Sequence, residues 1–294
     1  MPELPDLTIY LEHLERRTRD ASLVAIRLAS PFVLRTVAPT VAQVCGRRVR
    51  GWRRLAKQLV LELEGDHYVV MHLMISGRLR WERVGAPIPK RNGLAAFDFE
   101  SGSLIFTEAS KKRRASLKLV AGVESLMVLD PGGLDVTGAS LEEFASRLRA
   151  ANHTLKRALT DQHIFAGIGN AYSDEILLRA RLSPFKHAGT LSDDEVGQLY
   201  AACRDVLSEW TSRLREQAGD TFPMNVTAFH PEMAVHGKFR EPCPVCGAPV
   251  QRIVYAENES NYCAKCQTEG RLLADRLLSR LLKASWPKRL EDLE

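Results

Sequence analysis

The 294-residue sequence has no long hydrophobic run and no strong excess of charge. No stretch of roughly eighteen apolar residues occurs, so we expect no membrane-spanning helix. No signal peptide opens the chain, which favours an intracellular protein. The formal net charge is only +5, which permits a polyanionic partner without requiring one.

Cysteine is scarce outside one motif. Of six cysteines, two stand alone in apolar sequence, Cys45 and Cys203. The others form two CxxC pairs separated by 16 residues: Cys243, Cys246, Cys263 and Cys266. Without an export signal, this arrangement favours a metal site plus two buried thiols over disulfide bonds. Two separated pairs of thiolates suit one closed, tetrahedral, structural Zn²⁺, with iron as an alternative metal.

The chain opens with Met1-Pro2-Glu3-Leu4-Pro5-Asp6. Removal of Met1 would leave the secondary amine of Pro2 at the terminus. An α-amino group titrates near pH ~8, far below the ~10.4 of lysine, so this amine would be a usable nucleophile near neutral pH. Glu3 could shuttle the protons that attack on a sugar C1′ requires. The alternative interpretation is that Pro2 and Pro5 only stiffen the start of a helix.

Two regions with different periodicity follow the opening helix. Alternation and turn residues predict strands at 58–63, 67–74, 94–99, 104–107 and 116–120. The segment Asp130-Pro131-Gly132-Gly133 is a strong breaker, and we place a domain boundary there. Helical spacing of apolar residues then begins with Leu141, Phe144 and Leu148.

Three landmarks occur in a fixed order: PELPD at 2–6, GIGNAYSDE at 167–175, and the paired CxxC motif. With them, the chain resembles the formamidopyrimidine-DNA glycosylase and endonuclease VIII family of base-excision repair enzymes. The resemblance covers Pro2 to about Gln267. It implies an α+β fold, with a β-sandwich lobe and N-terminal helix followed by a helical lobe that carries a helix-two-turns-helix element and a zinc-finger β-hairpin. We therefore expect four domains: a catalytic domain at 1–130, a helical DNA-binding domain at 131–235, a zinc finger at 236–267 and a helical extension at 268–294.

The resemblance implies a bifunctional DNA glycosylase and abasic-site lyase that excises damaged, oxidised bases. Pro2 would form a Schiff base with C1′, Glu3 would relay protons, and β-elimination would cut the strand. Lys57 matches a lysine beside the scissile phosphate, whereas by itself it indicates a solvated hairpin. The implied partner is damaged double-stranded DNA, and no membrane is involved. The protein would act as a monomer in the bacterial cytoplasm, at the nucleoid.

DNA contacts follow from the same resemblance. His72 matches a phosphate-contacting histidine, although a histidine in an apolar strand is more often a core residue. Arg113, in the basic run 111–114, matches an arginine that pairs with the orphaned base, although such runs are usually solvated loops. Asn170 would add a donor to a phosphate at a glycine-rich helix start. His236 stands in place of a phosphate-binding tyrosine.

The chain departs from the family pattern at several positions. Ala115 replaces a wedging phenylalanine, Ile75 stands in place of a void-filling methionine, and Met74 stands where glycine is usual. Either Met74 or Ile75 must fill the gap left by an extruded base, or the substrate is less tightly paired. Asn258 replaces an arginine that assists the second strand cut, so we expect weak δ-elimination but retained phosphate binding. The segment 216–231 does not match the loop that closes over a flipped purine in the 8-oxoguanine branch. The preferred lesion is therefore not implied.

Two other classes of protein fit parts of the pattern. A non-catalytic, zinc-containing binder of damaged or distorted DNA is the main alternative, because several family contacts are altered. A zinc-ribbon transcription or ribosome factor would explain the cysteines but not the first six residues. Beyond Gln267, leucines at helical spacing between 272 and 282 predict a helix docked on the second lobe, with a partner-binding surface as the alternative.

Overall fold

The computed structural model describes residues 1–150, 152–224, 226, 229–255, 258–274, 280–281 and 287–293. The chain divides into two compact units, Met1–Pro131 with Trp210–Thr227, and Gly132–Glu209 with Ala228–Glu294. Helix α7 (Asp193–Ala218) therefore contributes residues to both units. The domain limits predicted from the sequence stay predictions. In the described ranges, none of the helices has the length and apolar character needed to cross a membrane.

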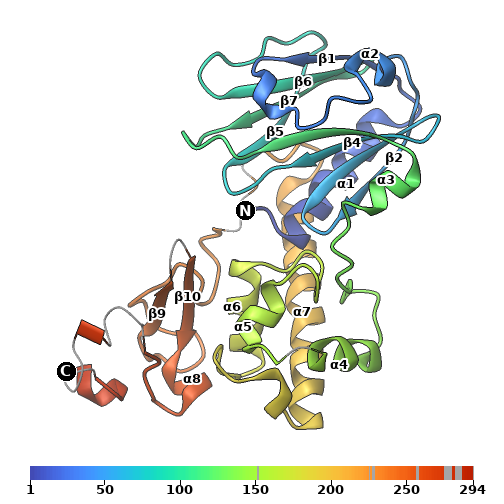
Figure 1. Cartoon of the computed structure of the whole chain (residues 1–294). Coiled ribbons are helices and arrows are strands. Elements are labelled where there is room, and N and C mark those ends of the chain that lie inside the picture. Colours follow the sequence, from blue (N-terminus) through green and yellow to red (C-terminus); the bar gives the residue numbers. More distant parts are fainter. Residues whose placement is uncertain are drawn as a thin grey trace. The chain divides into compact units, whose positions relative to one another are not determined.

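The first unit is a β-sandwich with an N-terminal helix, α1 (Leu4–Thr18) (Figure 1). Two four-stranded antiparallel sheets have the orders β1-β6-β7-β5 and β2-β3-β4-β8. The strands are β1 (Leu23–Leu28), β2 (Val49–Leu55), β3 (Gln58–Leu63), β4 (His67–His72), β5 (Gly77–Glu82), β6 (Gly93–Phe99), β7 (Gly102–Glu108) and β8 (Ser116–Ala121). Short helices occur at η1 (Pro31–Val33), α2 (Val41–Val44) and α3 (Val123–Met127).

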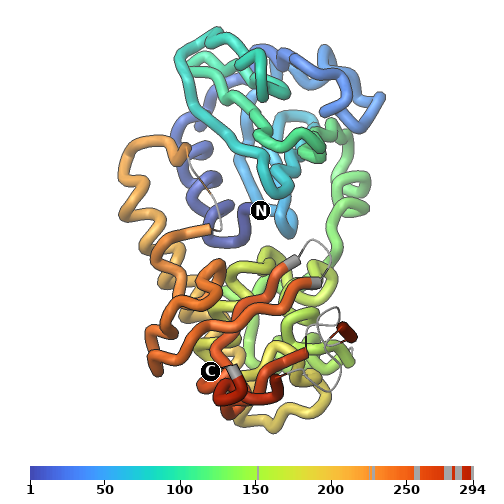
Figure 2. The backbone as a smooth tube through the Cα atoms, turned by 90° about the vertical axis from the view of Figure 1, so that its left-hand side faces the viewer, coloured from blue at the N-terminus to red at the C-terminus, as the bar shows by residue number. Residues whose placement is uncertain are grey.

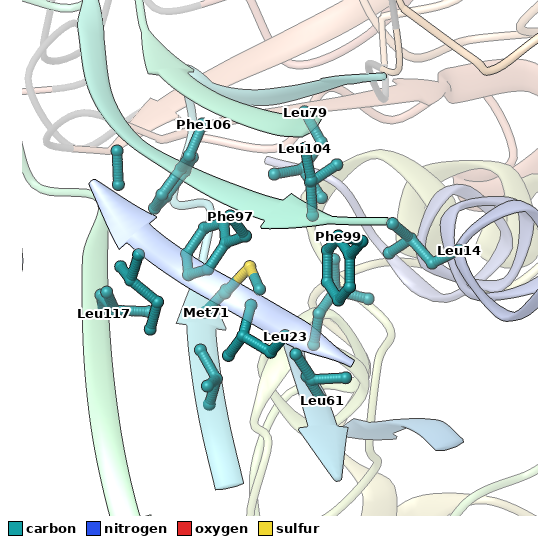
Figure 3. Packing of buried hydrophobic residues seen from close by; sticks show 14 of the residues in the cluster. Leu14, Leu23, Leu61, Met71, Leu79, Phe97, Phe99, Leu104, Phe106 and Leu117 are labelled. Atoms are coloured by element: carbon teal, nitrogen blue, oxygen red, sulfur yellow. The ribbon is translucent and has the colours of Figure 1, made fainter. Parts of the chain in front are cut away.

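The core of the first unit lies between its two sheets. Figure 3 shows Phe97 and Phe106 of one sheet facing Met71 and Leu117 of the other, and all four are essentially fully buried. Leu14 of α1 closes the end of this cluster. Because each strand alternates its side chains, the outer faces of the sheets carry smaller buried clusters of their own, with Val60 and Val70 on one sheet and Ala96 and Ile105 on the other.

The predicted β-sandwich is confirmed, but three strands were missed by the sequence analysis: β1, β2 and β5. Strand β2 carries Arg50, Arg53 and Arg54, and its half-buried residues do not alternate cleanly. The predicted strand 67–74 is also too long, since β4 ends at His72. Met74 has a φ of 52°, which places it in a turn rather than in a strand.

The second unit is helical with a two-stranded hairpin, β9 (Val250–Tyr255) and β10 (Asn258–Cys263). Figure 2 gives a second view of this hairpin, in orange to red. The other elements are α4 (Leu141–Arg149), α5 (Leu155–Thr160), α6 (Asn170–Arg179), η2 (Ala188–Thr190), α8 (Ala264–Thr268) and η4 (Leu290–Leu293). Of the leucines predicted to form a C-terminal stripe, Leu277, Leu278 and Leu282 lie outside the described residues.

Candidate active site and nucleic-acid interface

The predicted catalytic residues at the N-terminus are buried. Glu3 is the residue before α1, and its backbone N–H donates to Asp6 Oδ2 at 2.8 Å. Pro2 is buried, and Glu3 and Asp6 are 2% and 1% exposed. The helix start therefore holds two carboxyl groups, Glu3 and Asp6, beside the chain terminus, shielded from solvent.

The terminal amine lies in the field of four charged groups. Burial lowers the pKa of the Met1 α-amine, the nearby positive charges of Arg78 and Lys57 lower it further, and Glu3 and Asp6 oppose the change. In a processed chain, the Pro2 nitrogen would take the place of this amine, one residue later. A lowered pKa increases the unprotonated fraction, which is the nucleophilic form.

Asp6 has an unusual environment for a carboxylate. Burial raises its pKa to about 7, against the opposing hydrogen bond from the Glu3 backbone. Within the described part of the chain, Asp6 Oδ1 is buried and has no hydrogen-bond partner. A neutral carboxylic acid avoids the cost of an unpaired buried charge, so Asp6 is poised to hold a proton near neutral pH.

Lys57, in the turn between β2 and β3, lies close to His72 at the end of β4. Lys57 is 6% exposed in the turn before β3, and its neighbour Gln58 pairs with His72 of β4. Burial lowers the pKa of His72 to about 4, and the charges of Lys57 and Lys118 add to the effect. His72 Nδ1 accepts the N–H of Met74 at 3.1 Å, which assigns the proton of the neutral ring to Nε2. His72 can thus donate one hydrogen bond without carrying charge.

The turn after β4 presents an apolar side chain. Ile75 is 56% exposed, whereas Met74 is half-buried. The turn is closed by Gly77 N–H, which donates to Leu73 O at 2.8 Å. A Cβ at Gly77 would lie 2.2 Å from that oxygen, so only glycine fits there. Of the two candidates for the gap-filling role, the structure exposes Ile75.

The basic run 111–114 is exposed and is held at its end by Glu108. Glu108 is 3% exposed, and its carboxylate accepts the backbone N–H groups of Arg114 and Ala115, each at 3.1 Å. Arg113 reaches Arg91 O at 3.2 Å through its guanidinium. Ala115 is 2% exposed and belongs to the β-sandwich core, so this position presents no wedge to a ligand.

In the second unit, a glycine-rich turn precedes α6. Gly167 has a φ of 88°, which favours glycine. Gln162 fixes this turn, because its Oε1 accepts Gly167 N–H at 2.8 Å and its Nε2 donates to Ile168 O at 2.8 Å. Asn170, the first residue of α6, donates through Nδ2 to Glu259 O at 2.6 Å. The predicted phosphate contact of Asn170 thus involves a side chain that also holds the zinc hairpin.

Two carboxylates of α6 tie the second unit together. Asp174 has a fully buried side chain and receives four hydrogen bonds, from Lys156, His236, Ser260 and the backbone of Asn261. Glu175 accepts the backbone N–H groups of residues 234–236 at 2.8–3.0 Å. Neither carboxylate was predicted to have a role, although both lie within the GIGNAYSDE segment.

His236 is held from two sides. Its Nδ1 is 2.8 Å from Asp174 Oδ2, and its side chain is 4% exposed. Its ring packs against the ring of Phe229, with 5.2 Å between the ring centroids. The predicted DNA contact of His236 would have to be made from this buried position. Asn258 is the first residue of β10, and its side chain lies outside the described residues.

The four paired cysteines converge, as their spacing predicts. The sulfur atoms of Cys243, Cys246, Cys263 and Cys266 all lie within 4.8 Å of one another. A tetrahedral zinc ion with bonds of ~2.3 Å requires sulfur atoms about 3.8 Å apart. The turn of the first pair is closed by Gly247 N–H, which donates to Cys243 O at 2.8 Å. Four converging thiols fit one structural zinc ion.

Comparison with known proteins agrees with this architecture. The N-terminal domain of formamidopyrimidine-DNA glycosylase matches residues 1–115, its helix-two-turns-helix domain matches 133–216, and the zinc finger found in these enzymes and in isoleucyl-tRNA synthetase matches 240–268. The formamidopyrimidine-DNA glycosylase of Roseiflexus sp. is 32% identical over 275 residues, which cover 91% of this chain and 100% of the relative. The chain belongs to the formamidopyrimidine-DNA glycosylase family.

Solved structures of this family have the same fold. The formamidopyrimidine-DNA glycosylase of Thermus thermophilus has a TM-score of 0.76 at 32% identity and covers 90% of this chain and 98% of its own. A Lactococcus lactis variant in complex with DNA that contains Fapy-dG has a TM-score of 0.79 at 25% identity, covering 91% and 100%.

Membership identifies the chain as a DNA glycosylase with abasic-site lyase activity and one structural zinc ion. The alternative of a non-catalytic DNA binder is not favoured. A transcription or ribosome factor is excluded, because the glycosylase N-terminal and helix-two-turns-helix domains match as well as the zinc finger.

Proposed function

We propose that this glycosylase uses the Pro2 nitrogen, freed by removal of Met1, as its nucleophile. The observation that carries the proposal is the buried position of Pro2 next to Glu3 and Asp6, at a chain start where burial and the charges of Arg78 and Lys57 lower the pKa of the Met1 α-amine. A buried amine among balanced charges is a better nucleophile than an exposed terminus.

The reaction begins when the Pro2 nitrogen attacks C1′ of the damaged nucleotide. The N–C1′ bond forms, the bond from C1′ to the base breaks, and the base leaves with the bonding electron pair and a proton. Ring opening places a proton on O4′ and leaves an iminium on Pro2. Loss of a C2′ proton then expels the 3′ phosphate, and water releases the enzyme. Glu3 relays protons at the amine and at O4′.

The remaining predicted contacts are assigned by their chemistry. Lys57 and neutral His72 donate hydrogen bonds to the phosphates beside the damaged sugar. Lys57 donates through its ammonium group, and His72 donates through Nε2–H. Asn170, at the N-terminal end of α6, holds a backbone phosphate, where the helix dipole favours negative charge. Asn258 and His236 add hydrogen bonds to the DNA backbone. Asn258 does so without the fixed positive charge of an arginine.

The gap left by the extruded base is filled by Ile75, and Arg113 pairs with the orphaned base. Ile75 is the exposed apolar side chain of its turn. With Ala115 in the core, the wedge at the stack is shallow, which favours lesions that already weaken pairing.

The substrate class is oxidised bases in double-stranded DNA. This class is supported by a solved complex of the Lactococcus lactis family member with DNA that contains an oxidised pyrimidine. We infer that one copy of the chain acts alone, because the proposed nucleophile and the zinc finger belong to one chain. It would act in the cytoplasm, on DNA at the nucleoid. When bound, zinc cross-links the base of the hairpin. The residues around it orient Asn258 and the backbone of β10.

Borohydride trapping tests the proposal. Purified protein should lack Met1 by mass spectrometry and should form a covalent adduct with DNA that contains an abasic site. Pro2→Gly retains a terminal amine and should trap more weakly, whereas a retained Met1 should abolish trapping. An adduct of full yield on a chain that keeps Met1 would refute Pro2 as the nucleophile. A panel of oxidised purines, oxidised pyrimidines and abasic sites would then define the lesion.

The product of strand cleavage tests the role of Asn258. We expect mostly β-elimination product, because asparagine supplies no positive charge to the second leaving phosphate. Asn258→Arg should increase δ-elimination, and an efficient one-nucleotide gap in the wild type would contradict this assignment.

A further inference from the structure

The segment that follows the zinc-finger match folds back on itself beside the hairpin. The match ends at residue 268. Beyond it, Leu272 N–H donates to Lys288 O at 2.8 Å, and Leu290 N–H donates to Gly270 O at 3.0 Å. Figures 1 and 2 both draw this red segment next to β9, β10 and α8. We name the described residues 269–274 and 287–293 the C-terminal clamp.

The C-terminal clamp covers one face of the hairpin. Tyr262 of β10 is 1% exposed, and its hydroxyl accepts the N–H of Leu273 at 2.8 Å. Leu272 packs in one cluster with Tyr262, Ile253 and Ala264, and Leu273 and Leu290 lie against it. The apolar side chains of this face are therefore buried by residues that lie outside the family match.

The opposite face of the hairpin packs on different partners. Val250 and Cys263 form a separate cluster with Leu178 of α6 and Val235. On β10, Asn261 Oδ1 accepts the N–H of Gly237 at 2.8 Å. The hairpin is thus held on one face by α6 and the segment before the zinc knuckle, and on the other face by the C-terminal clamp.

We propose that the C-terminal clamp is a positioning element of the zinc finger, which holds β10 in place for metal retention and for the grip on DNA. A two-stranded hairpin is marginally stable alone, so its position depends on what packs on each face. Tyr262 directly precedes Cys263. A shift of Tyr262 is therefore transmitted to a zinc ligand in the next residue. The part that concerns DNA rests on the proposed function.

Two variants of the full-length holoprotein test the clamp. Tyr262→Phe removes the hydroxyl that accepts Leu273 N–H and keeps the ring. Leu272→Ala removes the apolar contact. Leu281→Ala is the matched control, because Leu281 is 77% exposed. Zinc release to a chelator is followed with a colorimetric metal indicator. Release of a duplex that carries an uncleavable abasic-site analogue is followed by fluorescence.

We expect Tyr262→Phe to speed zinc release about fivefold, the effect of one lost hydrogen bond of about 1 kcal/mol. Leu272→Ala should speed it at least tenfold. DNA release should accelerate in the same order, and Leu281→Ala should match the wild type. A lower melting temperature with unchanged zinc and DNA release would make the segment merely structural and overturn the proposal. Absence of a borohydride adduct in the wild type would instead count against the proposed function and leave the zinc result standing.

Discussion

Glu108 accepts the backbone N–H of Ala115 at 3.1 Å, with its other oxygen on the N–H of Arg114. Glu108 is the last residue of β7 and pairs with Gly77, which opens β5 after the Ile75 turn. One buried carboxylate therefore sits at the base of two loops, the basic loop 110–114 and the turn that exposes Ile75.

The two loops are also joined directly, since Ala109 N–H donates to Ser76 O at 3.3 Å. The side chains proposed to enter the DNA stack, Ile75 and Arg113, therefore share one support. A change in Glu108 should alter both contacts at once, without touching the nucleophile.

Glu108→Gln should reduce kcat/KM on duplex DNA about tenfold. Glutamine offers one acceptor oxygen, so one of the two loop N–H groups loses its partner, and a buried unsatisfied donor costs about 1–3 kcal/mol. Most of the loss should appear in KM, because the loop binds DNA and the nucleophile is intact. Glu82→Gln, at an exposed position, is the control. Unchanged kinetics in both variants would show that Glu108 does not set the loop.

The zinc site could be predicted from the sequence because each CxxC pair places two thiols within one short turn, and the four thiols converge in the structure. The helical lobe was predictable from short-range periodicity in α4 and α5. The catalytic role of the N-terminal residues stays a prediction.

Contacts between distant residues could not be predicted. Asp174 and Asn261 are far apart in sequence, and their 3.1 Å contact exists only after α6 packs on β10. Strand β2 was missed because its arginines interrupt the alternation of apolar and polar residues. Its extended conformation is instead stabilised by pairing with β3. The C-terminal clamp depends on Leu272 meeting Tyr262, which the leucine spacing did not indicate.

Ile75→Ala should lower activity on duplex DNA more than on single-stranded DNA. Removing the exposed side chain leaves the gap in the duplex unfilled, and the cost of unstacking is then not offset. We expect about a tenfold loss of kcat/KM on a duplex lesion and less than twofold on the single strand. Val37→Ala, which is 95% exposed on the same unit, should change neither. Equal losses on both substrates would refute a gap-filling role.

Asp6→Asn should change the pH dependence of stability. The folded state holds the Asp6 proton up to about pH 7, whereas the unfolded chain loses it near pH ~3.9. The folded protein binds more protons between these values, so this group's stabilisation is complete below pH ~4 and is lost as pH rises through 7.

Asparagine does not titrate, and its side-chain oxygen can still accept the Glu3 N–H. The Asp6→Asn variant should therefore match the wild type near pH 4 and exceed its unfolding free energy by about 2 kcal/mol or more at pH 8, after allowance for relaxation around the buried charge. Denaturant unfolding at several pH values measures this difference. A gap that does not grow between pH 5 and pH 8 would mean that Asp6 is ionised throughout.

Asp174→Asn should weaken both stability and DNA binding. Asp174 Oδ1 lies 2.5 Å from the Lys156 ammonium, whose side chain is 13% exposed, so the variant leaves a nearly buried cation without its counter-charge. Loss of one partner of such a pair costs about 3 kcal/mol or more. Adding Lys156→Met should restore much of the stability but not the affinity for DNA, because the position of β10 still depends on the lost carboxylate. Glu209→Gln, in an exposed pair with Arg179, should cost less than about 1 kcal/mol. If the double variant regains full DNA affinity, Asp174 only neutralises Lys156 and does not position the hairpin.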